Sequence, residues 1–378
     1  MQNFSLAPSL QINAAKWFGL MLVCLMGFSW SSFALADSDS DTSGIERKWV
    51  ESPNVNGRLT ANDLGMVINT EDPYSVKVGE YYAKARGLTE AQILRVSLPV
   101  KSTLMPEEFA KLKQRIDEFF GDRVQALALV WRMPYSVNYC NAITAAVTLG
   151  FDGSFCKQSC VATRASKYFG SVSTRPYRDY KMRLSMLLAA SSVESAKELI
   201  DRGVKSDGTL AKKGVPAPNV HFVTTFDLQR NVRKYFYPPE GKMPGANVQV
   251  HLDETEAIKN KSRVLMYMTG SPSVDYLDTN EFLPGALADH LTSFGGVLDQ
   301  PHGQMTVLSW IGAGATATYG TTSEPCAHWQ NFPHPQALLL FYVNGASAIE
   351  SYWKSVLWPQ QGLFVGEPLA APFSRALP

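Results

Sequence analysis

The residues best suited to chemistry gather between Pro284 and Cys326. Ser293 is the candidate nucleophile, and His290 or Glu324 is the candidate base that would take its proton. The main-chain amides of Gly295 and Gly296 could approach an oxyanion, because glycine allows a backbone to come close to a ligand. This combination of groups indicates a serine-dependent hydrolase, a peptidase or an esterase, or a binding site built from the same groups.

A structural interpretation of these residues stays open beside the catalytic one. The nucleophile motif Gly-x-Ser-x-Gly is absent, since Leu291 stands where its first glycine would be. Asp289 and His290 are adjacent, and adjacent side chains often point in opposite directions. A lone histidine in an apolar stretch is more often a hydrogen-bonded core residue, and paired glycines often serve only tight turns.

No cofactor is expected from the sequence, and the histidines of this region do not indicate a metal centre. Gly-x-Gly-x-x-Gly and the P-loop pattern are absent, so no nucleotide cofactor is expected. Asp227 and Arg230 resemble an i,i+3 pair on a helix surface, and with Arg233 they offer at most a weak anion site. The remaining histidines of this region lie in proline-rich loops without the spacing of metal ligands: His302, His328 and His334.

Four cysteines follow the apolar N-terminal stretch: Cys140, Cys156, Cys160 and Cys326. An even number of cysteines in an exported chain favours two disulfides, for which three pairings are possible. Three of the four share one loop-rich segment, so at least one bridge is expected there. A zinc site is the alternative, although no histidine between Cys140 and His221 completes a local ligand set. Cys326 as a free nucleophile is a minor third hypothesis.

The first 36 residues have the pattern of a secretory signal peptide. Lys16 precedes an apolar stretch, residues 17–33, and Ala34-Leu-Ala36 offers a cleavage site after Ala36. We therefore expect a periplasmic or secreted protein with no stable membrane anchor after cleavage. The whole chain has 35 basic and 34 acidic residues, and removing Lys16 leaves the charges balanced. This balance, without runs of like charge, argues against nucleic acid as a partner.

Periodic apolar segments predict the elements that must position these residues. Strands are expected at 64–69, 93–98, 124–131, 184–190, 220–225, 264–269, 313–319 and 362–365. Helices are expected at 73–87, 106–121, 191–203, 304–311, 336–344 and from Ser347 to before Pro359. The alternation predicts an α/β fold with a mainly parallel sheet covered by helices on both faces. The expected organisation is a flexible segment at 37–60, an N-terminal subdomain at 61–183 with the cysteine loops, and a C-terminal subdomain at 184–378 with the site.

Four motifs of the chain resemble an uncharacterised family of exported bacterial proteins. They are the segments 289–296 (DHLTSFGG), 314–321 (GATATYGT), 324–326 (EPC) and 365–370 (VGEPLA), and the segment 81–87 (YYAKARG) fits the same family. The likeness covers nearly all of the chain after the signal peptide, and it implies no established activity.

A more distant resemblance is to the gingipain-type cysteine peptidases of caspase-like fold. It rests on the order of the elements and implies a three-layer arrangement in which a His-Gly and a catalytic cysteine follow two neighbouring strands. Thr269-Gly270 and Thr292-Ser293 stand at the corresponding places, so the resemblance implies that both members of the dyad are missing. It therefore implies a catalytically degenerate protein that binds an unknown small molecule, peptide or protein near Thr269, Gly270, Thr292, Gly295 and Gly296. The alternative is a site rebuilt around Ser293.

Overall fold

A computed structural model describes residues 46–51, 55–299 and 302–375. The predicted signal peptide and its cleavage site lie outside these residues. The described residues form one compact unit. In the part of the chain that is described, no helix is long and apolar enough to cross a membrane.

Most strands join one large sheet, whose order is β2-β1-β4-β7-β14-β13-β12-β11-β8-β10-β9. A second, three-stranded sheet has the order β3-β5-β6. The strands of the large sheet are β1 (Leu64–Asn69), β2 (Ile93–Val96), β4 (Ala126–Val130), β7 (Leu184–Leu187), β8 (Asn219–Thr224), β9 (Gly241–Lys242), β10 (Gln249–Glu254), β11 (Val264–Gly270), β12 (Phe282–Leu291), β13 (Ala317–Thr321) and β14 (Gly362–Gly366). Those of the small sheet are β3 (Thr103–Leu104), β5 (Ser136–Val137) and β6 (Asn141–Ala142).

Apart from the short edge strand β9, which is antiparallel to β10, the large sheet consists of two parallel halves that run in opposite directions. Strands β2, β1, β4, β7 and β14 are parallel to one another. Strands β13, β12, β11, β8 and β10 are also mutually parallel, and β13 is antiparallel to β14. The carboxyl ends of the second half therefore meet at a single edge, which is where α/β sheets place ligands.

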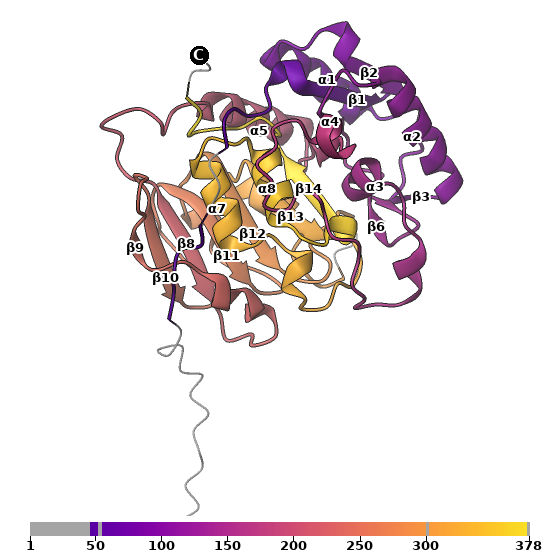
Figure 1. Ribbon diagram of the computed structural model, residues 1–378. Coiled ribbons are helices and arrows are strands. Elements are labelled where there is room, and N and C mark those ends of the chain that lie inside the picture. The colour runs from indigo at the N-terminus through magenta and orange to yellow at the C-terminus, as the bar shows by residue number, and fades with distance from the viewer. Residues whose placement is uncertain (1–45, 52–54, 300–301, 376–378) are drawn as a thin grey trace, which may run out of the picture. The chain divides into compact units, whose positions relative to one another are not determined.

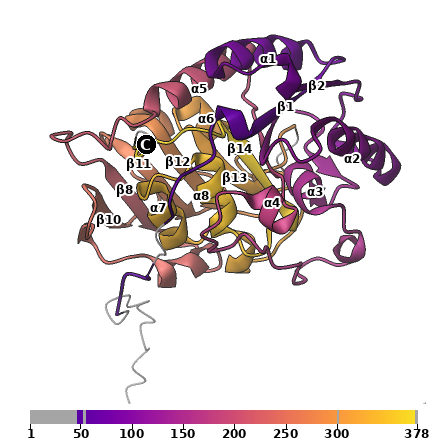
Figure 2. The same ribbon diagram turned by 45° about the horizontal axis from the view of Figure 1, so that its top comes forward.

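Helices cover both faces of this sheet and make a three-layer α/β fold (Figures 1 and 2). The helices are α1 (Pro73–Arg86), α2 (Pro106–Phe120), α3 (Ile143–Leu149), α4 (Pro176–Tyr180), α5 (Val193–Ser206), α6 (Leu308–Ala313), α7 (Pro335–Val343) and α8 (Ala348–Ser355). Helix α1 packs beside α5, and α7 packs beside α8. The predicted class, a mainly parallel sheet covered by helices, is confirmed.

Local sequence signals explain where several helices begin and end. Helix α1 starts with Pro73 behind the N-cap Asp72, whose side chain accepts from the Tyr74 amide, and it ends at Gly87, whose φ is 67°. Helix α8 has the capping box that Ser347 and Glu350 predict. These boundaries are therefore readable from the sequence.

Other boundaries differ from the prediction for identifiable reasons. The cap of α5 is Ser192, whose side chain accepts from the Ser195 amide, and not Ser191. Gly203 does not end that helix, because its role is close packing: a Cβ there would lie 2.6 Å from the Glu367 Cγ atom. Of the predicted helix 304–311, only residues 308–311 are α-helical, and they begin α6, which ends at Ala313. Gly314 has a left-handed backbone conformation, with a φ of 116°, and the next strand begins only at Ala317.

Strands β10 and β12, like the two-residue strands β3, β5, β6 and β9, are not among the strands predicted from the sequence. Strand β12 contains Pro284 and Gly285 near its start and the polar pair Asp289-His290 near its end. Each of these features argues against a buried strand when local sequence alone is considered. Pairing with β11 and β13 overrides them.

Within residues 46–51 and 55–60, the segment expected to be flexible makes hydrogen bonds to the rest of the domain. Gln336 of α7 binds both the Val50 amide and the Lys48 carbonyl group. The buried Leu59 donates its amide to the Glu350 carboxylate at 3.0 Å. Strand β7, where the second subdomain was expected to begin, pairs with β4 of the first.

Candidate functional site

The residues that suggested chemistry meet at the carboxyl edge of the second half-sheet. Strands β8, β11, β12 and β13 all end there, because they are parallel neighbours. Thr269 pairs with His290 across β11 and β12, and Gly270 pairs with Leu291. Thr292 and Ser293 follow β12 directly. The predicted site residues of these two strands are thus brought together.

His290 is a buried structural residue. Its Nδ1 atom accepts from the Trp310 Nε1–H group at 2.9 Å, because an indole nitrogen can only donate. Nε2 then carries the proton and donates to the Met305 carbonyl group at 3.0 Å. Burial lowers the pKa of His290 to about 4. Both ring nitrogens are occupied, so the predicted role of His290 as the base for Ser293 does not fit this geometry.

Asp289 lies on the opposite face of the sheet and forms a buried ion pair with Arg233. Arg233 also donates to the Thr269 carbonyl group at 2.7 Å and to the Pro333 carbonyl group at 3.3 Å. Burial raises the pKa of Asp289 to about 6, although the Arg233 charge opposes this shift. Arg233 is therefore an internal anchor and not a surface anion ligand. The predicted ion pair between Asp227 and Arg230 is present, at 2.6 Å, but Asp227 precedes the 3-10 helix that begins at Arg230 and does not lie on a helix surface.

The glycines of the region serve close packing. A Cβ on Gly270 would lie 2.1 Å from the Arg230 carbonyl oxygen, and one on Gly296 would lie 2.8 Å from the Gly320 carbonyl oxygen. The Gly296 amide already donates to the Thr321 carbonyl group at 2.9 Å. It is therefore not available to an oxyanion. A Cβ on Gly295 would lie 3.3 Å from the His290 Cε1 atom.

The turn after β12 is fixed by the side chain of Gln304. Its Oε1 atom accepts from the Thr292 hydroxyl at 2.6 Å and from the Phe294 amide at 3.0 Å. Ser293 is half-buried in this turn. Among the described residues, no hydrogen bond joins the Ser293 hydroxyl to His290 or Glu324. The arrangement has no acid–base partner in place for a serine nucleophile.

A cavity of about 290 Å³ opens beside this turn. We call it the Glu324 pocket. The Glu324 Oε1 atom accepts from the Cys326 amide at 2.7 Å, which orients the carboxylate. Tyr135 donates its hydroxyl to Asp299 at 2.5 Å, and the Tyr139 ring is 69% exposed. The lining combines aromatic rings, hydroxyls and one carboxylate: Tyr135, Ser136, Tyr139, Phe294, Val297, His302, Thr322, Ser323 and Glu324.

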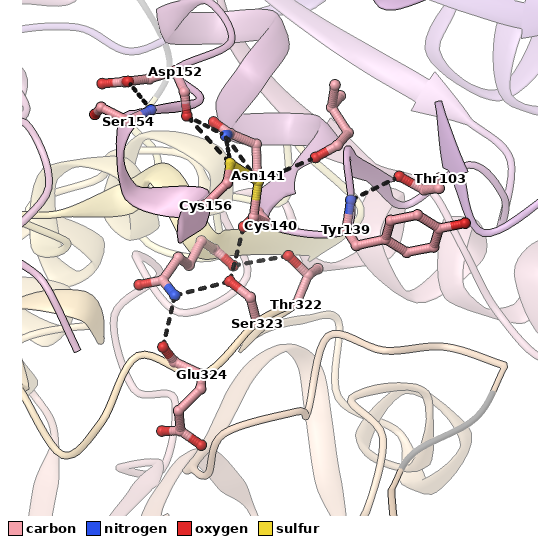
Figure 3. Close-up of a disulfide and its surroundings, with 12 residues drawn as sticks. Thr103, Tyr139, Cys140, Asn141, Asp152, Ser154, Cys156, Thr322, Ser323 and Glu324 are labelled. Carbon is pink, nitrogen blue, oxygen red and sulfur yellow. Dashed lines mark hydrogen bonds between the residues drawn. A yellow bond between two sulfur atoms is a disulfide. The ribbon is translucent and has the colours of Figure 1, made fainter. Parts of the chain in front are cut away.

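Two disulfides, Cys140–Cys156 and Cys160–Cys326, lie in the chain segments that carry lining residues of the Glu324 pocket. The prediction of two bridges is confirmed, and the pairing removes both the zinc alternative and a free Cys326 nucleophile. Figure 3 shows the first disulfide beside Ser323, whose hydroxyl donates to the Cys140 carbonyl group at 2.8 Å. Gln361 donates to the Ser323 hydroxyl and to the Glu324 carbonyl group. The loop that carries Glu324 is thus tied to the loop that carries Tyr139.

Within the described ranges, no group of three or more His, Cys, Asp or Glu side chains is placed to hold a metal ion. The Glu324 pocket is instead suited to an organic ligand. Its rings can contact an apolar or cationic group, and its carboxylate can accept from a donor. Sequence reasoning named Glu324 but missed the tyrosines at 135 and 139. The only signal in the sequence was their position beside Cys140, whose carbonyl group accepts from Ser323 of the loop after β13.

Comparisons with known proteins find distant structural likeness alone. No protein-family model and no curated protein matches the chain. The resemblance to an uncharacterised exported family therefore has no support from these comparisons. A solved structure described as a protease is similar with a TM-score of 0.44 and 12% identity, covering 83% of this chain and 79% of that chain. The Arg-specific cysteine proteinase gingipain R is similar with a TM-score of 0.37 and 10% identity, covering 85% of this chain and 80% of that chain. Scores this low support no statement about activity.

Proposed function

We propose that this chain is an exported, non-catalytic protein that binds a compact ligand in the Glu324 pocket. The observation that carries the proposal is the pocket itself, at the carboxyl ends of β12 and β13, with an oriented carboxylate and aromatic walls. Two disulfides hold the loops that form it, as expected for a protein outside the cytoplasm. The Ala34-Leu-Ala36 cleavage pattern supports export to the periplasm or beyond.

The surroundings of the pocket support binding more than turnover. The only histidine on the adjacent end of β12 is His290, whose two ring nitrogens bind Met305 and Trp310. The Gly296 amide, a candidate oxyanion donor, binds Thr321. Catalysis of acyl transfer needs a nucleophile, a base and free donors in one place, and both His290 and the Gly296 amide are bound to other groups.

The lining suggests the chemical class of the ligand. At about 290 Å³ the pocket lies at the small end of ligand sites. Its aromatic rings favour a flat or cationic group, and Glu324 favours a positively charged donor. We therefore expect a small amine with an apolar or aromatic body.

A charge-matched pair of probes tests this class. Saturation-transfer NMR of the mature protein should detect phenethylamine and not phenylacetate, which has a ring of the same size and the opposite charge. Equal signals from both compounds, or a preference for the acid, would contradict the proposal. Phenylacetate serves as the internal control for contact that depends on the ring alone.

A second candidate function is a hydrolase that uses Ser293, because Ser293 directly precedes Phe294 of the pocket wall. Labelling with a fluorophosphonate probe separates the two functions. The binding proposal predicts no labelling of the folded wild-type protein. Labelling that disappears in Ser293→Ala would replace binding by hydrolysis as the preferred function.

A further inference from the structure

A second cavity, of about 410 Å³, lies beside the edge strand β2. In the order of the large sheet, β1, β4, β7 and β14 separate β2 from β13, which ends at the Glu324 pocket. The second cavity is lined by residues 95–99, which are the end of β2 and the segment after it, and by Glu108, Lys111, Leu112 and Arg115 of α2. We call it the basic groove. In the described chain no strand pairs with the outer side of β2. The groove therefore combines an open strand edge with one face of a helix.

The main chain of β2 presents hydrogen-bonding groups to this open side. The Val96 carbonyl group accepts from the Thr70 amide at 2.8 Å, so Val96 turns its polar groups inward to β1. Polar groups of alternate residues on a strand point to opposite sides. Arg95 therefore turns its N–H and C=O groups outward, where an added strand would meet them.

The Arg95 side chain lies on the far face of the sheet. Arg95 pairs with Ile68, and Ile68 faces α1, since a Cβ on Gly79 of that helix would lie 2.6 Å from the Ile68 Cδ1 atom. The guanidinium group is bound to Glu90 at 2.8 Å. On the α2 side, Arg95 therefore contributes its backbone to the groove.

The side chains on the α2 face make an apolar floor and a basic rim. Leu98 and Leu112 are buried and Val96 is half-buried, whereas Lys111 and Arg115 are exposed. The acidic residue Glu108 is bound to Lys101, with both carboxylate oxygens 2.8 Å from the ammonium nitrogen. The hydrogen bond from Lys101 holds the pKa of Glu108 below its usual value. Lys111 and Arg115 remain as the positive charges of the rim. Arg115 lies 3.9 Å from the exposed Glu118, and an acidic ligand would have to displace this weak i,i+3 pair.

We propose that the basic groove binds an acidic, extended peptide segment of a partner protein, which joins the large sheet as a strand beside β2. Main-chain bonds to Arg95 would hold the segment. Its side chains would alternate, so that one set covers Leu98 and Leu112 and acidic side chains meet Lys111 and Arg115. A flat anionic ligand without a peptide backbone would use the rim but not the strand edge.

The test is the anisotropy of a fluorescent peptide of roughly eight residues, alternating Glu and Val, added to the mature protein. Saturable binding is expected, with at least about tenfold preference over the same peptide with Lys in place of Glu. N-methylation of alternate amides in the Glu peptide, on the side that meets Arg95, should weaken binding by about tenfold or more, because it removes the strand bonds. Equal binding of the methylated peptide would overturn strand addition, and absence of binding would overturn the proposal.

Two double variants with the same change in charge test whether the peptide binds at the basic groove. Lys111→Glu with Arg115→Glu should weaken binding of the Glu peptide by about tenfold or more. The control is Lys77→Glu with Lys84→Glu, which makes the same charge change on exposed positions of α1 and should leave binding unchanged. An equal loss in both double variants would show attraction by net charge alone and would overturn the site.

Discussion

At the scale of single residues, the site is held by polar side chains that the fold has removed from solvent. Arg233, in the segment after β8, forms a buried ion pair with Asp289 of β12. Arg233 also binds the Thr269 carbonyl group at 2.7 Å. A buried charge without its partner is far costlier than an exposed one. The sequence showed Arg233 beside Arg230 and offered no sign that one is buried and the other is not.

Arg233→Met should lower the free energy of unfolding by about 3–5 kcal/mol, because it leaves the Asp289 carboxylate buried and unpaired. Arg230→Met is the matched control. The Asp227–Arg230 pair is partly exposed, with side-chain exposures of 26% for Arg230 and 25% for Asp227, so its loss should cost about 1 kcal/mol or less. Urea unfolding measures both values, and similar costs for the two variants would refute the role given to Arg233.

His334, the N-cap of α7, gives the protein a defined dependence on pH. Burial, followed by the Arg233 charge, lowers its pKa to about 4, whereas an unfolded histidine titrates near 6.5. Between these values the unfolded chain binds a proton that the folded protein does not. Stability present above pH ~6.5 is therefore lost as the pH falls towards about 4.

Replacing His334 by Asn keeps a capping side chain and removes this titration. Between pH ~7 and ~5 the wild type should lose about 2 kcal/mol more of its unfolding free energy than His334→Asn does. Asp289, whose raised pKa of about 6 acts in the opposite direction, is common to both proteins and cancels. Parallel pH profiles for the two proteins would contradict the buried, neutral state of His334.

At the scale of elements, two of the motifs singled out in the sequence prove to be in contact. Tyr82 and Arg86 of α1 bind the buried Glu367, which follows β14. Arg86 also binds Asp207, just after α5, at 2.6 Å. The segments 81–87 and 365–370 thus form one internal cluster that joins α1, α5 and the C-terminal segment. Their role is structural, which the sequence could not distinguish from a functional one.

Gly203→Ala should destabilise the protein by about 1–3 kcal/mol, because the new methyl group would meet the Glu367 side chain at the centre of this cluster. Gly312→Ala is the control. Gly312 is an exposed helical glycine of α6 with nothing within 4 Å of a Cβ, so alanine there should be neutral or stabilising by up to about 1 kcal/mol. Thermal unfolding of both variants measures the difference, and a harmless Gly203→Ala would refute the close packing.

Elements with clear local signals were predictable, and those defined by tertiary pairing were not. Strand β1, helix α1 and the capping box of α8 follow directly from apolar periodicity and from Asp72, Gly87 and Ser347. Strand β12 carries Pro284 and a buried ion-pair residue, which only its neighbours make acceptable. The sequence predicts that the candidate site lies at the carboxyl ends of the strands. It does not predict the Glu324 pocket, because the position of the pocket loops depends on the disulfide pairing, and four cysteines allow three pairings.

At the scale of the whole molecule, the reversal between β13 and β14 separates two half-sheets. The disulfide Cys160–Cys326 joins the segment before β7 of the first half to the loop after β13 of the second. Cys160–Cys326 spans 166 residues of sequence, and Cys140–Cys156 spans 16. In the chain-entropy model a crosslink stabilises more when it closes a longer loop. The longer disulfide should therefore contribute more to the stability of the molecule.

Replacing Cys160 and Cys326 by Ser should cost about 5 kcal/mol of unfolding free energy, against about 3 kcal/mol for replacing Cys140 and Cys156. Urea unfolding of the two double variants under oxidising conditions compares them directly. A larger cost for the shorter loop would show that native contacts of Cys140, and not chain entropy, dominate.

The central claim is that the Glu324 carboxylate binds an amine, and calorimetric titration of phenethylamine tests it most directly. Glu324→Gln keeps an oxygen that can accept from the Cys326 amide but removes the charge. Glu107→Gln, at an exposed position of α2, is the control for net charge. We predict one-site binding to the wild type and to Glu107→Gln, weakened by about tenfold or more in Glu324→Gln. Equal affinity for all three proteins, or no binding to the wild type, would contradict the account.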